Sequence, residues 1–281
     1  MKFRNLRLAA MLGIFGLGVL LAAVVPRPAH AQSTQESVIE TIQKRGTRRV
    51  GLSTFVPWAM RDKDGNMIGF EVDVASKLAQ DMGVKLDLVP TAWDGIIPAL
   101  LAGKFDMIIG GMTITPKRNL TVDFSHPYAY AGTGMAANKA LTANFKLQDF
   151  NSPKVTFACR RATTACMAVA KYFPKAAMRQ FDDDSAVAQE VLDGNAQVFA
   201  SSEPFPTDTT LDNPGKLWLP LGAGQEMDKL PSGIAIRKGD PDALNFINNW
   251  IELRTEDGWL EQRHHYWFAT HDWKSQVAAT Q

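Results

Sequence analysis

The chain has 281 residues, of which 46% are hydrophobic and 21% are charged, and its net charge is +1. A folded chain of this length forms one large or two smaller domains. No basic block stands out that would bind nucleic acid, so we expect no nucleic-acid partner.

The N-terminus has the pattern of a secretory signal peptide. Basic residues precede an apolar run from Leu8 to Val25, and Ala29-His30-Ala31 follows. This order predicts cleavage after Ala31, so residues 1–31 would direct the protein to the periplasm. An uncleaved membrane anchor is the alternative, because the apolar run is nearly long enough to span a bilayer. Removing the four basic residues of this segment changes the net charge from +1 to −3.

Strand and helix patterns alternate through the rest of the chain. Apolar residues at helical spacing predict a helix over 70–82, and alternating residues predict a strand over 84–88. Glycines close the predicted helices, and the pattern indicates a parallel sheet covered by helices. A second α/β unit begins near Lys154, after an extended segment from 129 to 137. From Asp240 to Leu260 the spacing predicts one long helix.

The segment from Gly110 to Tyr128 contains a candidate anion site. Gly110 and Gly111 follow the predicted strand 105–109, and Thr115-Pro116 has the form of a helix start. Arg118 comes two residues later. Backbone N–H groups, hydroxyls and a guanidinium are thus expected together, an arrangement that binds a carboxylate.

Cysteines and histidines give weaker signals. Cys159 and Cys166 could form a disulfide in an oxidising compartment, or remain two thiols. His264, His265 and His271 lack carboxylates at useful spacing, so we interpret them as a solvated face and expect no metal or cofactor.

Several short motifs follow one another over nearly the whole chain after residue 31. They are Val50-Gly51, Phe55–Trp58, Gly69–Asp73, Trp93–Leu100, Gly103–Asp106, Met112–Arg118, Asp123–Tyr128 and Gly233–Gly239. In their order and spacing, these motifs resemble the polar-amino-acid type of extracytoplasmic solute-binding protein that serves ABC importers (family 3).

The resemblance implies an α/β protein with the two-lobed periplasmic-binding-protein fold (type II), whose lobes are joined by two hinge strands. Lobe one would comprise 32–130 and 232–281, and lobe two 131–231, with hinges near 129–133 and 225–231. Such a protein is a monomer that captures a small carboxylate, an amino acid or related organic acid. It delivers this ligand to the permease of an ABC importer in the inner membrane.

The resemblance also assigns binding roles to residues. Arg118 would pair with the ligand's carboxylate beside Thr113, and the main chain of Gly110 and Gly111 would meet the ligand. Phe55, Trp58 and Trp93 would form walls, although Trp58 could instead pack within its own lobe. Thr163 and Thr164 would lie at the N-terminus of a helix in lobe two, which would hold the ligand's carboxylate from the other side.

Two departures from the family bear on the ligand. Ser202 stands where the family usually has an Asp for the α-ammonium. The adjacent Glu203 is a second candidate for this role, although adjacent strand residues point to opposite faces. Arg160 and Arg161 add positive charge near the ligand's side chain. One of these neighbours should face solvent, and Arg160 is the candidate ligand contact. These features favour an acidic or non-amino carboxylate over a cationic amino acid, because an unpaired buried ammonium is costly.

An enzyme is the alternative function. Cyclohexadienyl dehydratases resemble this family and act on a carboxylated ring in the same compartment. Glu203 could then serve as a general acid while Arg118 holds the substrate's carboxylate. Apart from Glu203, no acid is placed to protonate a leaving group, so we expect a binding protein.

Overall fold

The computed structural model describes residues 36–277 of the chain. The predicted signal peptide, residues 1–31, lies outside the described residues. Among the helices of residues 36–277, none has both the length and the apolar character needed to cross a membrane.

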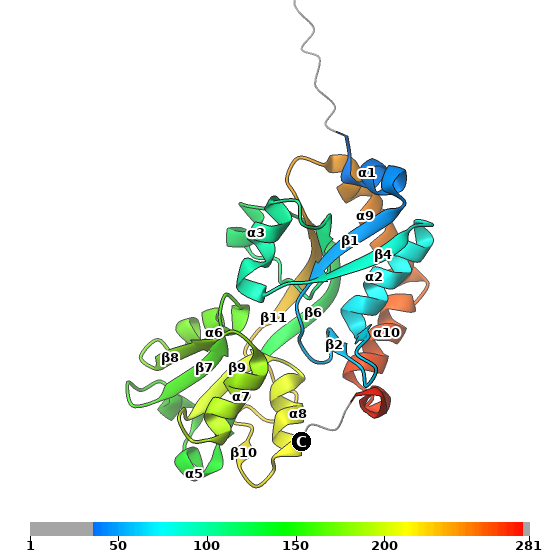
Figure 1. The fold of residues 1–281 in the computed structure, drawn as a ribbon. Helices are drawn as coiled ribbons and strands as arrows, with labels where there is room; N and C mark the ends of the chain where they lie inside the picture. The colour runs from blue at the N-terminus through cyan, green and yellow to red at the C-terminus, as the bar shows by residue number, and fades with distance from the viewer. Residues whose placement is uncertain (1–35, 278–281) are drawn as a thin grey trace, which may run out of the picture. The chain divides into compact units, whose positions relative to one another are not determined.

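The first half of the fold follows the predicted alternation of strands and helices (Figure 1). Strand β1 pairs in parallel with both β4 and β5, while β2 and β3 form a separate antiparallel hairpin. Strand β5 is shorter than the strand predicted over 105–109, because residues 104–106 form a bend. The elements are α1 (Val38–Arg45), β1 (Thr47–Leu52), β2 (Met60–Arg61), β3 (Met67–Ile68), α2 (Phe70–Asp81), β4 (Lys85–Pro90), η1 (Trp93–Gly95), α3 (Ile96–Leu101), β5 (Met107–Ile108) and α4 (Pro116–Asn119).

A second α/β unit follows, as the sequence predicts. Strand β7 pairs in parallel with β8 and β9. Helix α8, which begins just after Pro204, lies in a stretch where the sequence showed little pattern, because its prolines and threonines give no apolar stripe. The elements are α5 (Lys139–Thr142), η2 (Leu147–Phe150), β7 (Thr156–Arg160), α6 (Thr164–Tyr172), β8 (Ala177–Phe181), α7 (Asp184–Leu192), β9 (Val198–Ser202), α8 (Phe205–Asp212) and β10 (Leu217–Trp218).

Two long strands, β6 (Asp123–Asn138) and β11 (Lys229–Ile236), connect the two units. They pair with each other, β11 also pairs with β5, and β6 continues to pair with β9. In the described part of the chain, the resulting sheet has nine strands in the order β4-β1-β5-β11-β6-β9-β7-β8, with β10 beside β6. The expected lobe boundaries fall within this pair, where Tyr130 lies opposite Pro231 and Ala131 opposite Leu230. The division into 32–130 with 232–281 and 131–231 stays a prediction.

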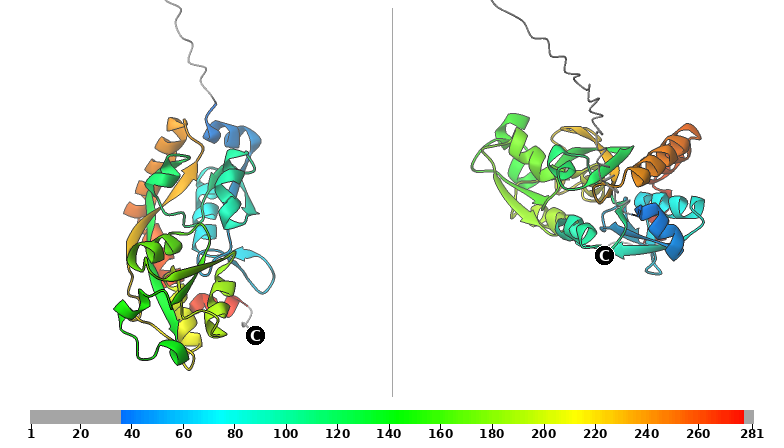
Figure 2. Two further views of the ribbon diagram at one scale, coloured as in Figure 1. Left: turned by 90° about the vertical axis from the view of Figure 1, so that its left-hand side faces the viewer. Right: turned by 90° about the horizontal axis from the view of Figure 1, so that it is seen from above.

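The C-terminal segment corrects the prediction of one long helix. It forms α9 (Pro241–Glu256) and α10 (Trp259–Phe268), followed by η3 (Asp272–Gln276). The helix breaks at Gly258, whose φ of 76° lies in the left-handed region that glycine adopts without a steric penalty. Both helices lie beside α2 in Figure 2 and share its hydrophobic core.

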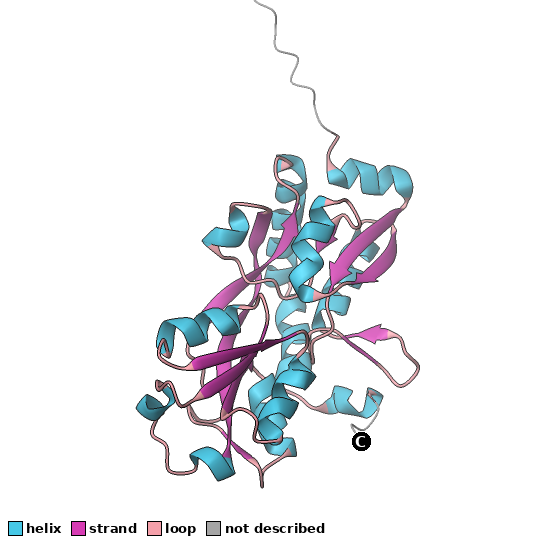
Figure 3. Cartoon of the chain, turned by 60° about the vertical axis from the view of Figure 1, so that its left-hand side comes forward, coloured by secondary structure: helices cyan, strands magenta, loops and turns pink. Residues whose placement is uncertain are grey.

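Separate hydrophobic clusters fill the two units, with helices on both sides of the strands (Figure 3). His264 packs against the hydrophobic cluster of the first unit, which corrects its assignment to a solvated face. Its ring stacks on Phe268 at 4.3 Å between centroids and meets the edge of Phe70 at 5.5 Å. The sequence missed this because α10 turns His264 toward α2 after the break at Gly258.

Candidate ligand-binding site

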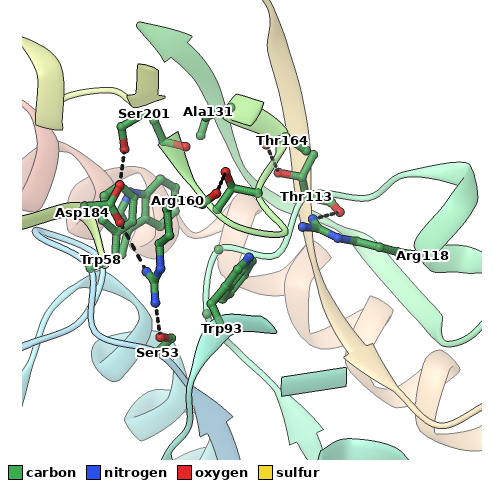
Figure 4. Close-up of a pocket in the computed structure, with 16 residues that line it drawn as sticks. Ser53, Trp58, Trp93, Thr113, Arg118, Ala131, Arg160, Thr164, Asp184 and Ser201 are labelled. Carbon is green, nitrogen blue, oxygen red and sulfur yellow. Dashed lines mark hydrogen bonds and ion pairs between the residues drawn. The ribbon is translucent and has the colours of Figure 1, made fainter. Parts of the chain in front are cut away.

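A cavity of about 50 Å³ lies between the first unit and the second, at the ends of their strands (Figure 4). Of the predicted site residues, all except Glu203 line it. The lining residues are Ser53, Phe55, Trp58, Trp93, Gly110, Gly111, Thr113, Arg118, Ala131, Arg160, Thr163, Thr164, Ala165, Asp184, Ser201 and Ser202. Their role in binding a ligand stays a prediction.

The Gly110–Arg118 segment has the predicted local structure. The side chain of Thr115 caps α4 by accepting a hydrogen bond from the backbone N–H of Arg118 at 3.2 Å. Gly111 has a φ of 64°, and a Cβ there would approach the Trp58 ring to 3.1 Å. Glycine therefore permits both the turn and the close approach of the main chain to the indole.

Arg118 is a half-buried cation that reaches from one unit to the other. Its two terminal nitrogens donate to the carbonyls of Thr113 and Ala162, each at 2.9 Å. Among residues 36–277, no carboxylate forms an ion pair with it. Burial lowers the pKa of Arg118 to about 10, so its guanidinium stays protonated at neutral pH.

A tight loop brings the opposite wall to Arg118. A disulfide joins Cys159 to Cys166 and closes the loop from the end of β7 into α6. Within it, Ala162 has a left-handed φ of 60°, and its carbonyl also accepts from Trp93 Nε1 at 3.3 Å. Helix α6 begins at Thr164, one residue after its N-cap Thr163, and the hydroxyl of Thr164 lies 3.4 Å from that of Thr113.

Arg160 forms the floor of the cavity with Asp184, which the sequence analysis did not identify as a site residue. Their ion pair measures 3.3 Å, and the residues are only 5% and 9% exposed. Arg160 also donates to the hydroxyl of Ser53 at 2.6 Å and to the carbonyl of Thr54 at 3.1 Å. It therefore connects β7 in the second unit to the end of β1 in the first.

Asp184 has a second partner, Ser201, whose hydroxyl donates to the other carboxylate oxygen at 2.6 Å. Burial raises the pKa of Asp184, while the hydrogen bond from Ser201 and the charge of Arg160 oppose that rise. Arg161, the neighbour of Arg160, faces solvent and pairs with Asp182 at 2.9 Å. One of the two arginines thus faces the cavity, as strand alternation predicts.

Aromatic side chains complete the walls. Trp58 lines the cavity yet is only 3% exposed, because it also packs against Phe70 and Phe268. Phe55 reaches Phe205 at the start of α8, with 6.0 Å between ring centroids. Arg118 and Arg160 each lie within 6 Å of the Trp93 ring, close enough for cation–π attraction.

The structure corrects the prediction that Glu203 lines the cavity. Ser202 lines the cavity, but Glu203, the next residue, points to the other face, where a Cβ at Gly134 would meet its carboxylate. Its position follows from the alternation of side chains at the end of β9. Burial raises the pKa of Glu203 to about 7, and the nearby carboxylates of Glu226 and Asp208 contribute to the rise.

Sequence reasoning missed five cavity residues: Ser53, Ala131, Ala165, Asp184 and Ser201. Ser53 directly follows β1, so the rule that ligands bind at the carboxyl ends of strands could have found it. Asp184 lies in a run of three aspartates at the start of a helix. The run indicates a cap, which is Asp183, but does not reveal that Asp184 turns into the cavity.

The described residues of this site do not include a cluster of side chains that could bind a metal ion. Over residues 36–277, no group of three or more His, Cys, Asp or Glu side chains is placed to hold a metal ion. The Asp62–Asn66 loop is a hairpin turn between β2 and β3, in which the Asp62 carboxylate accepts from the N–H groups of Asp64 and Asn66.

Two α/β units joined by a pair of long strands, with a cavity between them, define the two-lobed fold of periplasmic binding proteins. The sequence model for bacterial extracellular solute-binding proteins, family 3, matches residues 49–270. The chain belongs to this family. The resemblance inferred from the motifs is thereby confirmed, as is the fold class.

Individual relatives cover nearly the whole chain. The L-cystine-binding protein TcyJ of Escherichia coli K12 is 28% identical over 90% of this chain and 94% of its own. The putative binding component of an ABC transporter from Wolinella succinogenes, solved with lysine, is 38% identical with a TM-score of 0.76, covering 82% and 99%. An ancestral amino acid-binding protein, AncCDT-1, a precursor of cyclohexadienyl dehydratase, is 39% identical with a TM-score of 0.74, covering 83% and 100%.

Proposed function

We propose that this solute-binding protein captures a small carboxylate, an amino acid or related organic acid, in the periplasm and delivers it to an ABC importer. The names of its relatives, which bind cystine and lysine, support an amino-acid-like ligand. The observation that carries the proposal is Arg118, a half-buried guanidinium that lines the cavity without a carboxylate partner among the described residues. A cation that is partly removed from water favours an anionic partner, because a ligand that covers it without pairing would leave an uncompensated charge.

Binding would combine this charge with donors from both lobes. Arg118 would hold the ligand's carboxylate, assisted by the hydroxyls of Thr113 and Thr164 and by the N-terminus of α6. Trp58 and Trp93 would pack against the remainder of the ligand. Because Arg118 and Arg160 both reach across the cleft, a bound ligand would favour the closed arrangement, and the permease would recognise this closed form.

Cavity size supports a small ligand. The enclosed space between the two units measures about 50 Å³. This suits a compound of amino-acid size rather than an oligopeptide.

The first test is a melting-temperature screen of purified protein against amino acids, dicarboxylates and aromatic acids. A ligand present at 100 times its Kd should stabilise the folded state by about 2.7 kcal/mol. Mass spectrometry of the denatured protein would identify a molecule retained during purification. If no carboxylate shifts the melting temperature at millimolar concentration, the proposal is wrong.

The variant Arg118→Gln tests the role of Arg118 in binding, and Lys117→Gln is its matched control. Removing one partner of a buried charged contact costs about 2–5 kcal/mol, so affinity should fall at least about 30-fold. Lys117→Gln removes the same charge one residue away, on an exposed side chain that does not line the cavity. It should change affinity less than twofold. Equal losses in the two variants would refute a specific role for Arg118.

We infer that the protein binds its ligand without converting it. The similarity to a precursor of cyclohexadienyl dehydratase makes a dehydratase the alternative. Glu203 has a pKa near 7 but lies outside the cavity, and the acid inside it, Asp184, is engaged by Arg160 and Ser201. Incubation with prephenate or arogenate should leave both unchanged. Turnover that is lost in Glu203→Gln would instead establish the enzyme.

A further inference from the structure

Among residues 36–277, three charged side chains line the cavity: Arg118, Arg160 and Asp184. Asp184 is paired with Arg160, both are nearly inaccessible to water, and the pair connects the two lobes through Ser53. Arg118 forms no ion pair within residues 36–277. Two cations and one anion therefore leave the cavity with a net charge of +1.

Resting on the proposed function, we propose that the cavity selects ligands of net charge −1 and that Asp184 is the residue that sets this preference. In a closed cleft, charges interact through a low effective dielectric, so net neutrality matters more than in water. A ligand of charge −1 leaves the closed site neutral. A zwitterion leaves one cation uncompensated, and a cationic amino acid leaves two.

The contacts of Asp184 explain why it cannot simply replace the missing aspartate at Ser202. One of its oxygens accepts from Ser201, and the other accepts from Arg160. A ligand ammonium would therefore meet a carboxylate already shared with a guanidinium, and Ser202 offers only a hydroxyl. The cavity can accommodate a ligand ammonium when the ligand also carries a second carboxylate that compensates the charge of Arg160.

Two kinds of small molecule have the net charge of −1 that would neutralise the cavity. An acidic amino acid would place one carboxylate at Arg118, its ammonium near Asp184 and its second carboxylate toward Arg160. A monocarboxylate without an ammonium would need only Arg118. Both share the net charge of −1, and matched ligand pairs separate them: glutamate against glutamine, and phenyllactate against phenylalanine.

A series of variants changes the net charge of the cavity while each new side chain keeps nearly the size of the one it replaces. Arg160→Gln lowers the charge to 0, Asp184→Asn raises it to +2, and the double variant returns it to +1. The readout is the ratio of dissociation constants within each ligand pair, measured by calorimetry. At an effective dielectric of about 20 and a separation of roughly 8 Å, one charge changes this ratio by about 30-fold.

The expected result is that the wild-type protein binds the anion of at least one pair more tightly than its neutral partner. Arg160→Gln should reduce this preference by about 30-fold, and Asp184→Asn should increase it by a similar factor. The double variant should recover the wild-type ratio to within about threefold. Arg161→Gln, which removes a solvent-facing charge from the neighbouring residue, should leave the ratio unchanged.

A merely structural role of the pair predicts a different pattern. Both single variants would then weaken all ligands equally and leave the ratio at its wild-type value, which would overturn the proposal. Tighter binding of glutamine, phenylalanine or lysine than of the anions by wild-type protein would also overturn it, while the proposed function would stand. Failure of every carboxylate in the screen would refute both.

Discussion

Glu71 should make the protein less stable as pH rises through the neutral range. This side chain is fully buried in α2 and accepts a hydrogen bond of 2.6 Å from the hydroxyl of Tyr128. The backbone N–H of Gly111 donates to that hydroxyl at 3.2 Å, so the network reaches the cavity wall. Burial raises the pKa of Glu71 from 4.5 to about 8, against the effect of the hydrogen bonds.

The sign follows from linkage between protonation and folding. The folded state holds the Glu71 proton up to about pH 8, whereas the unfolded chain releases it near pH 4.5. Ionisation therefore stabilises the unfolded state across this interval, and the free energy of unfolding falls as pH rises. The shift of 3.5 pKa units (8 − 4.5), at 1.36 kcal/mol each, corresponds to about 5 kcal/mol between pH 4.5 and pH 8.

Glu71→Gln isolates this contribution, because the amide retains an acceptor for Tyr128 but cannot ionise. Urea unfolding of both proteins should give similar free energies near pH 4.5. By pH 8 the variant should be more stable than the wild type by an amount on the order of 5 kcal/mol. If the two pH profiles run parallel, Glu71 is not held protonated, and the reasoning from burial is wrong.

Two further changes test the packing around the site. Gly51→Ala should lower the free energy of unfolding by about 1–3 kcal/mol, because a Cβ there would lie 2.3 Å from the fully buried Phe105 ring; thermal unfolding would detect this. Replacing both Cys159 and Cys166 by Ser should cost about 2–3 kcal/mol, since their disulfide closes a short loop. It should also weaken ligand binding, measured by calorimetry, and unchanged affinity would show that the loop keeps its conformation without the disulfide.

Much of the fold could be predicted from the sequence because its signals are local. Thr115-Pro116 starts α4, and Gly46 ends α1 in a left-handed conformation. Predictions failed where a local pattern was weak or continuous across a break. Helix α8 has no apolar stripe, and the spacing of Leu244 to Leu260 concealed the break at Gly258.

The sequence by itself determined the class of protein and one end of its cavity. The segment from Gly110 to Arg118 contains the turn, the helix cap and the guanidinium within nine residues, so neighbouring positions specify their arrangement. The opposite end depended on tertiary structure. Arg160 meets Asp184, 24 residues later, within its own lobe, and it meets Ser53, more than 100 residues earlier, only after the two lobes pack. Whether a buried charge is paired is a property of such distant contacts, and the net charge of the cavity follows from them.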